Sequence, residues 1–478
     1  MLYNEPEIQA ANFDRLSAHE DWKIARGDLR PQISLDGSAG YLQRDRSTDG
    51  LVQSTGDGLM SRQIGVSIRQ LLYDGGTARE QTEAAVDGEL AQELVERSML
   101  ESRVVDLCEV YFEVLRSREQ VREAQAHVNR HKDMRDMIKA RAAADGNRAD
   151  LALVDGRLSL AVNAMDGQQL ALENSLIRFV RLTGQPASRL ERPEVPGVPP
   201  RQGDLDLTRN WDFLAAQAVL EAAVHKFEST KGNRRPKVYL DAGGSVGEDV
   251  QGIKGQDNEA RAMITMSWDL YNGGSNKALT KREHWQVRKA QELLRAASEE
   301  ANYRASLLWK EREGSKSSVN SLGDYVRRLE GVLADYQEQF KVGRQELLNI
   351  LDVQGELHGA RNKWIDAQYN VNTSAYRIWG VQGRLTATII GDEDVQAYFD
   401  RNPDREEVPQ NLRPVGALVS SASPRATTQI ADVSREDFVR AQQDGRISPS
   451  TSASWPREGP APPKLKSKRK FRLNPFAK

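Results

Sequence analysis

Two copies of one short motif stand at matching points of this chain: Leu72-Tyr73-Asp74-Gly75-Gly76 and Leu270-Tyr271-Asn272-Gly273-Gly274. Each copy follows a stretch of alternating apolar and polar residues and precedes a long stretch without proline. A turn from a strand into a helix requires backbone angles that glycine adopts without strain. The motif therefore predicts that a strand passes directly into a helix at two places, and it does not match the glycine patterns that bind phosphate.

Further landmarks repeat in the same order, again roughly two hundred residues apart. Asn4–Ala11 has a counterpart in Asn210–Ala216, and Arg30–Leu35 returns as Arg235–Leu240. Because chance seldom repeats several landmarks in sequence, we predict an internal duplication.

The duplication defines four segments. We expect a first repeat at 1–191 and a second at 210–401, each with a short helix, two strands and a long helical hairpin. Residues 192–209 contain clustered proline and glycine and are predicted to be a linker. Residues 402–478 lack periodicity, so we expect a largely disordered tail. Its basic run at 464–470 is either a solvated end or a segment attracted to anionic lipid or cell-wall polymer.

Alternating apolar side chains predict two strands in each repeat. Pro31 and Pro236 open the first strand of each pair because proline cannot continue a helix. Polar segments at 45–60 and 248–259 are expected to be exposed loops between the paired strands, like those at the mouth of a barrel. The residues expected on the apolar strand faces are Ile33, Leu35, Gly37, Ala39, Tyr41, Ile64, Val66, Ile68, Val238, Leu240, Ala242, Gly244, Val246, Ala262, Ile264, Met266, Trp268 and Leu270.

Two segments without internal proline, at about 77–143 and 276–341, predict very long helices. A helix of about 60 residues measures about 90 Å. Apolar positions follow a coiled-coil period, but Gln and Arg interrupt the apolar stripe, as at Gln354 and Arg361. This pattern is typical of a hydrated tunnel wall and also of a soluble coiled coil.

Composition excludes some classes of protein. The mean hydropathy of −0.64 and the 28% charged residues leave no apolar run of the length a membrane helix needs, whereas strands of a barrel stay possible. Cys108 is the single cysteine, so we expect it to pack in a helix and predict no disulfide framework. Met1–Asn4 lacks the features of a signal peptide, and the repeat indicates that the given start lies inside the first helix.

No chemical motif suggests an enzyme. His127 and His131 are the only histidines four residues apart, and no HExxH motif or cysteine accompanies them. We therefore expect no catalytic residue, no metal site and no cofactor. The formal net charge of −2 gives no reason to expect a nucleic-acid partner.

Strand number supplies an argument for assembly. Unpaired backbone groups cost several kcal/mol each in lipid, and four strands are too few to close a barrel. If the strands lie in a membrane, the chain must form a ring of copies, and three copies would provide twelve strands.

The duplicated strand pairs, the Tyr-x-Gly-Gly motifs and the two long hairpins resemble the TolC family of outer-membrane efflux and secretion channels. The resemblance covers about 4–390 and implies a mostly α fold with β-strands, a trimeric α/β-barrel. Its twelve-strand barrel would lie in the outer membrane, in contact with lipid, and its twelve-helix tunnel in the periplasm. It also implies a periplasmic adaptor protein and an inner-membrane ABC transporter as partners.

The hairpin tips are the most specific part of the resemblance. Residues 146–151, followed by 156–161, and residues 340–352 are similar to the tips of members that serve type I secretion systems. The resemblance implies that adaptors dock at the tips and that residues after the second tip line the periplasmic entrance, where an acidic residue is usual at one position that is asparagine here. The implied docking residues are Gly146, Arg148, Asp150, Val342, Gly343, Arg344 and Leu347, and the implied entrance residues are Asn349 and Asp352.

The sequence thus predicts an outer-membrane channel subunit, a passive exit duct of a tripartite export system for type I protein secretion. Two alternatives stay open. A channel for efflux of drugs and other small molecules would have the same architecture, and a soluble coiled-coil scaffold would share the helical pattern.

Overall fold

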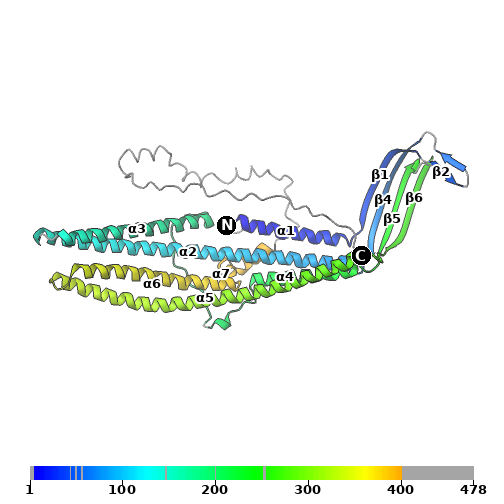
Figure 1. The fold of residues 1–478 in the computed structure, drawn as a ribbon. Coiled ribbons are helices and arrows are strands. Elements are labelled where there is room, and N and C mark those ends of the chain that lie inside the picture. Colours follow the sequence, from blue (N-terminus) through cyan, green and yellow to red (C-terminus); the bar gives the residue numbers. More distant parts are fainter. Residues whose placement is uncertain are drawn as a thin grey trace, which may run out of the picture. The chain divides into compact units, whose positions relative to one another are not determined.

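The computed structural model of the chain describes residues 5–43, 45–48, 51–54, 58–145, 148–199, 201–250 and 254–400. Gly146 and the tail at 402–478, both named in the predictions above, lie outside the described residues. Long helices, one curved sheet of four strands and a small two-stranded ribbon form most of the described part of the chain (Figure 1).

Each half of the chain contains one short helix, one very long helix and one shorter partner helix. α2 and α5 end within two residues of the predicted bounds because no proline interrupts them. We call α2–α3 the first hairpin and α5–α6 the second hairpin. The main helices are α1 (Pro6–Gly27), α2 (Thr77–Asp145), α3 (Arg148–Thr183), α4 (Trp211–Gly232), α5 (Ser275–Lys341) and α6 (Leu347–Val381).

Four strands form one antiparallel sheet in the order β1-β4-β5-β6, so the two halves of the chain meet at the β4–β5 pair. β1 and β6 are the two edges, and each has one partner strand in the part of the chain that the structure describes. The strands are β1 (Gln32–Leu42), β4 (Leu59–Tyr73), β5 (Lys237–Glu248) and β6 (Gln256–Ser267).

The strand bounds correct three sequence predictions. The segment 45–60 contains a two-stranded ribbon of β2 (Asp45–Thr48) and β3 (Leu51–Ser54), and β6 begins at Gln256 inside the second predicted loop. Both pieces are mostly polar, so the apolar alternation that predicts strands is missing there. β6 ends at Ser267, before Trp268 and Leu270, because its partner strand β5 begins opposite that residue.

Strand register places the predicted apolar residues on one face. Ile33 lies opposite Ile68, and Leu240 lies opposite Ile264. Ile33 and Ile264 are 70% and 72% exposed in the single chain. Moving one such side chain out of water stabilises a protein by about 1.5–3 kcal/mol, so a continuous apolar face of this kind requires a nonaqueous environment.

Apolar clusters hold the two hairpins together. Near the tips, Met134 and Val154 of the first hairpin pack with Val326 and Ile350 of the second. Farther along, Phe112 of α2 contacts Tyr376 of α6 with ring centroids 5.2 Å apart. The α2–α6 contact is therefore the main joint between the hairpins.

The segment after the first hairpin is held by side chains of α6. Residues 191–199, which overlap the predicted linker, have no regular secondary structure. Tyr376 Oη donates to the Glu194 carbonyl at 2.6 Å, and Trp379 Nε1 donates to the Gly197 carbonyl at 2.9 Å. A short 3₁₀ helix at Gln202–Asp204 follows.

Two short helices, α7 (Leu385–Ile390) and α8 (Asp392–Phe399), complete the second half and were not separated by the sequence analysis. Tyr398 and Phe399 of α8 pack against Ile8 and Leu100. This contact joins the end of the second half to α1 and α2 of the first.

Both Tyr-x-Gly-Gly motifs lie between the sheet and a long helix. In the first, Gly75 and Gly76 have φ of 77° and 92°, values that favour glycine. The Asp74 carboxylate accepts from the backbone N–H groups of Gly76 and Ala78 at 2.9 and 2.7 Å, so it caps the start of α2. Gly273 and Gly274 repeat the left-handed angles, and Asn272 takes the place of the capping aspartate, accepting at a longer 3.3 Å.

We predict that Gly75→Ala destabilises the chain more than Gly76→Ala. Both replacements force a side chain into the left-handed region, at about 1–2 kcal/mol. At Gly75 the added Cβ would also lie 2.8 Å from the Gly232 carbonyl oxygen, whereas Gly76 is open. Thermal unfolding followed by circular dichroism measures the difference, with Gly88→Ala in an open part of α2 as the control. Equal losses at Gly75 and Gly76 would contradict the steric argument.

Candidate functional site

The tip of the second hairpin is a short turn after α5. Gly343 has φ of 74°, and its N–H donates to the Phe340 carbonyl at 3.0 Å. The N–H of Arg344 donates to the Gln339 carbonyl at 2.9 Å. This pair of bonds is a Schellman motif, which ends a helix by satisfying its last carbonyl groups. The sequence Val-Gly-Arg therefore stops α5 at a defined residue and reverses the chain.

The side chains of the tip differ in their exposure to solvent. Val342 is 69% exposed, and a Cβ at Gly343 would meet nothing within 4 Å. Arg344 is also exposed. Leu347 is buried in the apolar cluster between the hairpins, so its side chain packs inward.

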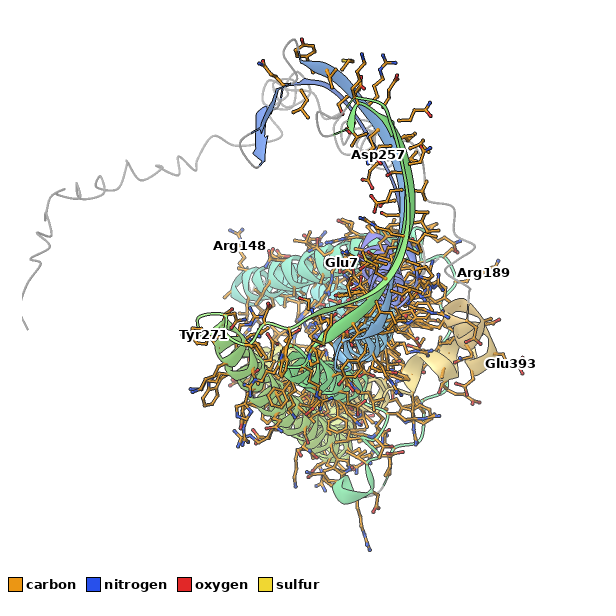
Figure 2. The ribbon with its side chains drawn as sticks, turned by 90° about the vertical axis from the view of Figure 1, so that its right-hand side faces the viewer. Glu7, Arg148, Arg189, Asp257, Tyr271 and Glu393 are labelled. Carbon is orange, nitrogen blue, oxygen red and sulfur yellow. The ribbon has the colours of Figure 1, made fainter. Side chains whose placement is uncertain are left out.

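Residues of both tips line an open groove of about 360 Å³. Asp150 of α3 lines it together with Gly343 and Leu347. Arg148 does not line this groove and is exposed at the start of α3 (Figure 2). The structure thus unites Asp150 with the second tip, a neighbourhood that spacing along the chain could not reveal.

Past the second tip, Asn349 and Asp352 are exposed on α6. Asp352 Oδ1 accepts from Arg157 Nη2 of α3 at 2.7 Å, which links one hairpin to the other. The sequence places Arg157 beside the first tip but does not predict its contact with Asp352, because nothing in the local pattern around that arginine indicates its partner. The Asp352 carboxylate is therefore balanced by a cation of the same chain.

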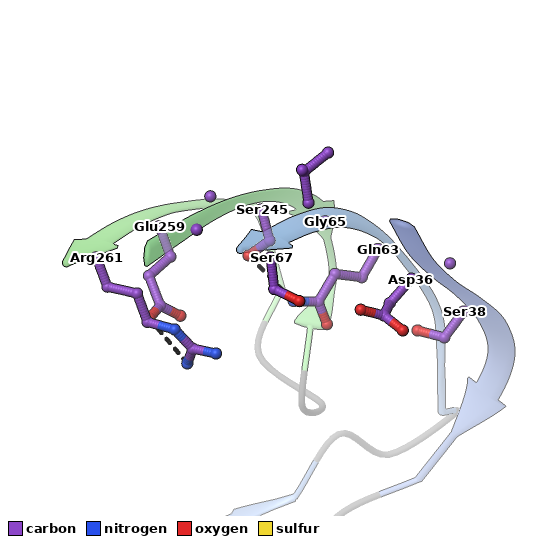
Figure 3. A pocket seen from close by; sticks show the side chains of 12 residues that line it. Asp36, Ser38, Gln63, Gly65, Ser67, Ser245, Glu259 and Arg261 are labelled. Carbon is purple, nitrogen blue, oxygen red and sulfur yellow. Dashed lines mark hydrogen bonds and ion pairs between the residues drawn. The ribbon is translucent and has the colours of Figure 1, made fainter. Parts of the chain in front are cut away.

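The second candidate surface is the polar face of the sheet. Asp36, Gln63, Ser245 and Arg261 lie on the same side, opposite to the apolar face (Figure 3). Gln63 Nε2 donates to Ser245 Oγ at 3.2 Å. These residues line a hollow of about 270 Å³ on that side of the strands, so the sheet has one wettable and one apolar surface.

A polar cluster ties three strands together on this face. Arg69 Nε donates to Asp241 Oδ1 at 2.7 Å, and Thr265 Oγ1 donates to the other oxygen of the same carboxylate. β4, β5 and β6 each contribute one of these residues. The alternation of polar residues in the sequence predicts this face but not which side chains pair.

Two features are absent from the part of the chain that the structure describes. None of the helices in that part of the chain has the length and apolar character needed to cross a membrane. Among the same residues, His, Cys, Asp and Glu nowhere gather in a set of three or more that could hold a metal ion.

Comparisons with known proteins agree with this architecture. A family model described as outer membrane efflux protein matches residues 1–184 and 204–383. The outer membrane efflux protein BepC of Brucella suis is 22% identical over 386 residues, covering 78% of this chain and 81% of BepC. The outer membrane protein TolC of Vibrio cholerae is 22% identical over 428 residues, covering 81% of this chain and 90% of TolC. The crystal structure of VceC from Vibrio cholerae shares the fold, with a TM-score of 0.71 and 14% identity over 80% of this chain and 94% of VceC.

Curved sheet, paired long hairpins and family match together define an outer-membrane channel protein of the TolC type rather than an enzyme. Because the family model covers more than half of its residues, this chain belongs to the outer membrane efflux protein family. TolC-family channels are homotrimers that work with adaptor proteins and inner-membrane transporters.

We predict that Arg157→Gln and Asp352→Asn each increase the time the channel spends open. The ion pair crosses between hairpins, and both side chains are partly exposed, so a contribution of about 0.2–1 kcal/mol is expected. That corresponds to roughly a 1.5- to 5-fold change in the open fraction, measured by single-channel recording in planar bilayers. Asp155→Asn is the matched control because the Arg135–Asp155 pair lies within the first hairpin. A similar increase in the open fraction of the Asp155→Asn channel would contradict a specific role for the ion pair between the hairpins.

Proposed function

We propose that three copies of this chain form the exit duct of a tripartite export system and that its cargo is protein, as in type I secretion. The observation that carries the proposal is the second tip, where Val342 and Gly343 stand exposed beside a groove. The sequence of this tip resembles those of type I secretion channels, and its geometry leaves room for a helical partner.

Both edges of the sheet support the trimer. β1 and β6 are antiparallel edge strands, so the β6 edge of one copy can pair with the β1 edge of the next. Pairing removes the cost of unsatisfied backbone groups in lipid. Three copies of a four-stranded sheet provide twelve strands, enough to close a barrel.

The helices also leave apolar surface for neighbouring copies. Phe13 of α1, Ile177 of α3 and Trp285 and Tyr303 of α5 are each more than 60% exposed in the single chain. Isolated exposed apolar residues are common, but large ones repeated on several helices favour burial in an assembly. In the proposed ring, α1 and α3 of one copy pack against α5 of the next.

Adaptor docking is assigned to the exposed residues of the tips and to the half-buried Asp150. Val342 would supply an apolar contact, Gly343 would allow close backbone approach, and Arg148, Asp150 and Arg344 would supply charge. Leu347 is buried, so we propose that it positions the turn without touching the adaptor. Gly146 belongs to the first tip by sequence.

Efflux of small molecules is the second candidate function. It is favoured by the relative BepC, which is itself named an efflux protein. Both functions use the same duct, so the difference lies in the inner-membrane partner and the cargo.

We predict that Gly343→Glu abolishes export while heat-modifiable trimers still reach the outer membrane. A charged side chain would fill the space left open at the turn and block close approach of a partner. Gly343→Ala is the matched control because it introduces the same backbone strain, about 1–2 kcal/mol, without bulk or charge. Normal export by the glutamate variant would remove this tip from the docking surface.

We predict that deleting the gene removes specific proteins from the culture medium and that the full-length gene restores them. Mass spectrometry of the medium measures this loss, and susceptibility to dyes and detergents is measured in the same strains. Unchanged secreted proteins combined with at least fourfold greater susceptibility would replace protein secretion by small-molecule efflux.

A further inference from the structure

Three of the six histidines meet at the α2–α6 joint, where nothing in the proposed export function requires them. His127 and His131 lie one turn apart on α2, and His358 lies on α6. The rings of His127 and His358 are stacked, with centroids 4.2 Å apart and planes 7° apart. The His131 ring meets His127 edge-on at 4.5 Å. An imidazole stack therefore bridges the two hairpins.

Two of the three rings, those of His127 and His131, are buried and neutral. His127 and His131 are 6% and 2% exposed. Within the described part of the chain, the Nδ1 atoms of all three rings lack a hydrogen-bond partner. Burial, with the nearby imidazoles and Arg130, lowers the pKa of His127 to about 3. Burial, with Arg130 and Arg157, lowers the pKa of His131 to about 4.

One carboxylate faces the cluster, and its charge is already shared with two arginines. Glu123 is the nearest carboxylate, and its oxygens already accept from Arg130 Nη2 at 2.7 Å and Arg361 Nη1 at 3.1 Å. Its Oε1 lies 3.7 Å from His358 Nδ1, too far for a hydrogen bond.

The remaining charges come from α3 and α5. Arg157 of α3 adds positive charge near His131, and Glu330 of α5 is paired with Arg361 at 2.5 Å. Burial alone would raise the pKa of Glu123, but His358 and the two arginines outweigh it and lower the pKa to about 2. The carboxylate therefore stays charged at mildly acidic pH, and its charge is already balanced.

We propose that the His127–His131–His358 cluster is an acid-sensitive joint, in which protonation separates α6 from α2 and thereby favours the open tunnel. The joint lies near the tips: His131 precedes the end of α2 by 14 residues, about 21 Å along the helix. The consequence for opening rests on the proposed channel function, whereas the pH dependence of the contact does not.

The direction of the pH effect follows from the pKa values of His127 and His131 in the closed and the separated states. An imidazole exposed by separation has a pKa near 6.5, well above its value in the closed contact. The closed contact is fully stable above about pH 6.5 and loses stability as the pH falls toward 4 and 3, where the buried rings themselves titrate. Within that window each of the two histidines shifts the ratio of closed to separated states up to about tenfold per pH unit.

Hydrogen–deuterium exchange of the purified full-length trimer tests the joint directly. Protection of α6 around His358 is compared at about pH 7.5 and about pH 5, where roughly thirtyfold loss is expected from one histidine and more from two. Intrinsic exchange rates at each pH are corrected for. The double variant His127→Phe/His131→Phe keeps aromatic packing without titration and should lose this response. His284→Gln, at an exposed site on α5, should keep it.

Two results would overturn the proposal: unchanged protection in the wild-type trimer, or an equal pH response in the double variant. If the phenylalanine variant forms no heat-modifiable trimer, His127→Gln/His131→Gln provides the same comparison. Single-channel conductance at the same pH values tests opening separately. Loss of protection without greater conductance would overturn the proposal that protonation of the cluster opens the tunnel. The export proposal would be unaffected, because neither measurement involves a cargo.

Discussion

Backbone hydrogen bonding is the constraint on which this structure depends. The sheet of one chain ends at β1 and β6, and its apolar face is suited to a medium that cannot satisfy those edges. Such a sheet is complete only in a ring of copies. The helices follow from the same requirement, because each strand pair continues into a hairpin that must also lie beside its neighbours in the ring.

The hairpins combine apolar packing with buried polar contacts. Glu96 is fully buried on α2, and its carboxylate accepts from Arg15, Asn12 and Tyr398. Glu101 accepts from the backbone N–H groups of Leu385 and Thr386 at the start of α7. Burial, partly opposed by these hydrogen bonds, raises the pKa of Glu101. Polar groups of this kind contribute geometric specificity, because breaking one pair leaves an unsatisfied buried charge.

Periodicity predicted most of the fold, because long helices and alternating strands are local patterns. The apolar faces through Ile33 and Ile264 and the ends of α2 and α5 follow from such patterns. The polar ribbon of β2 and β3 carries no alternation and was missed. Side-chain partners were also out of reach: Arg157 and Asp352 are 195 residues apart in the sequence, and their contact depends on how two hairpins pack.

The two strand-to-helix junctions share a motif but differ in stiffness. In the first, β4 continues to Tyr73 and an aspartate caps α2 through two hydrogen bonds. In the second, pairing stops at Ser267 and Tyr271 is 85% exposed, projecting away from the helices (Figure 2). A trimer built from duplicated halves has approximate sixfold symmetry, but these junctions reduce it to a true threefold. Stiff and flexible strand-to-helix junctions would alternate around the ring. Twisting of the tunnel relative to the barrel would therefore bend the chain at three junctions rather than six.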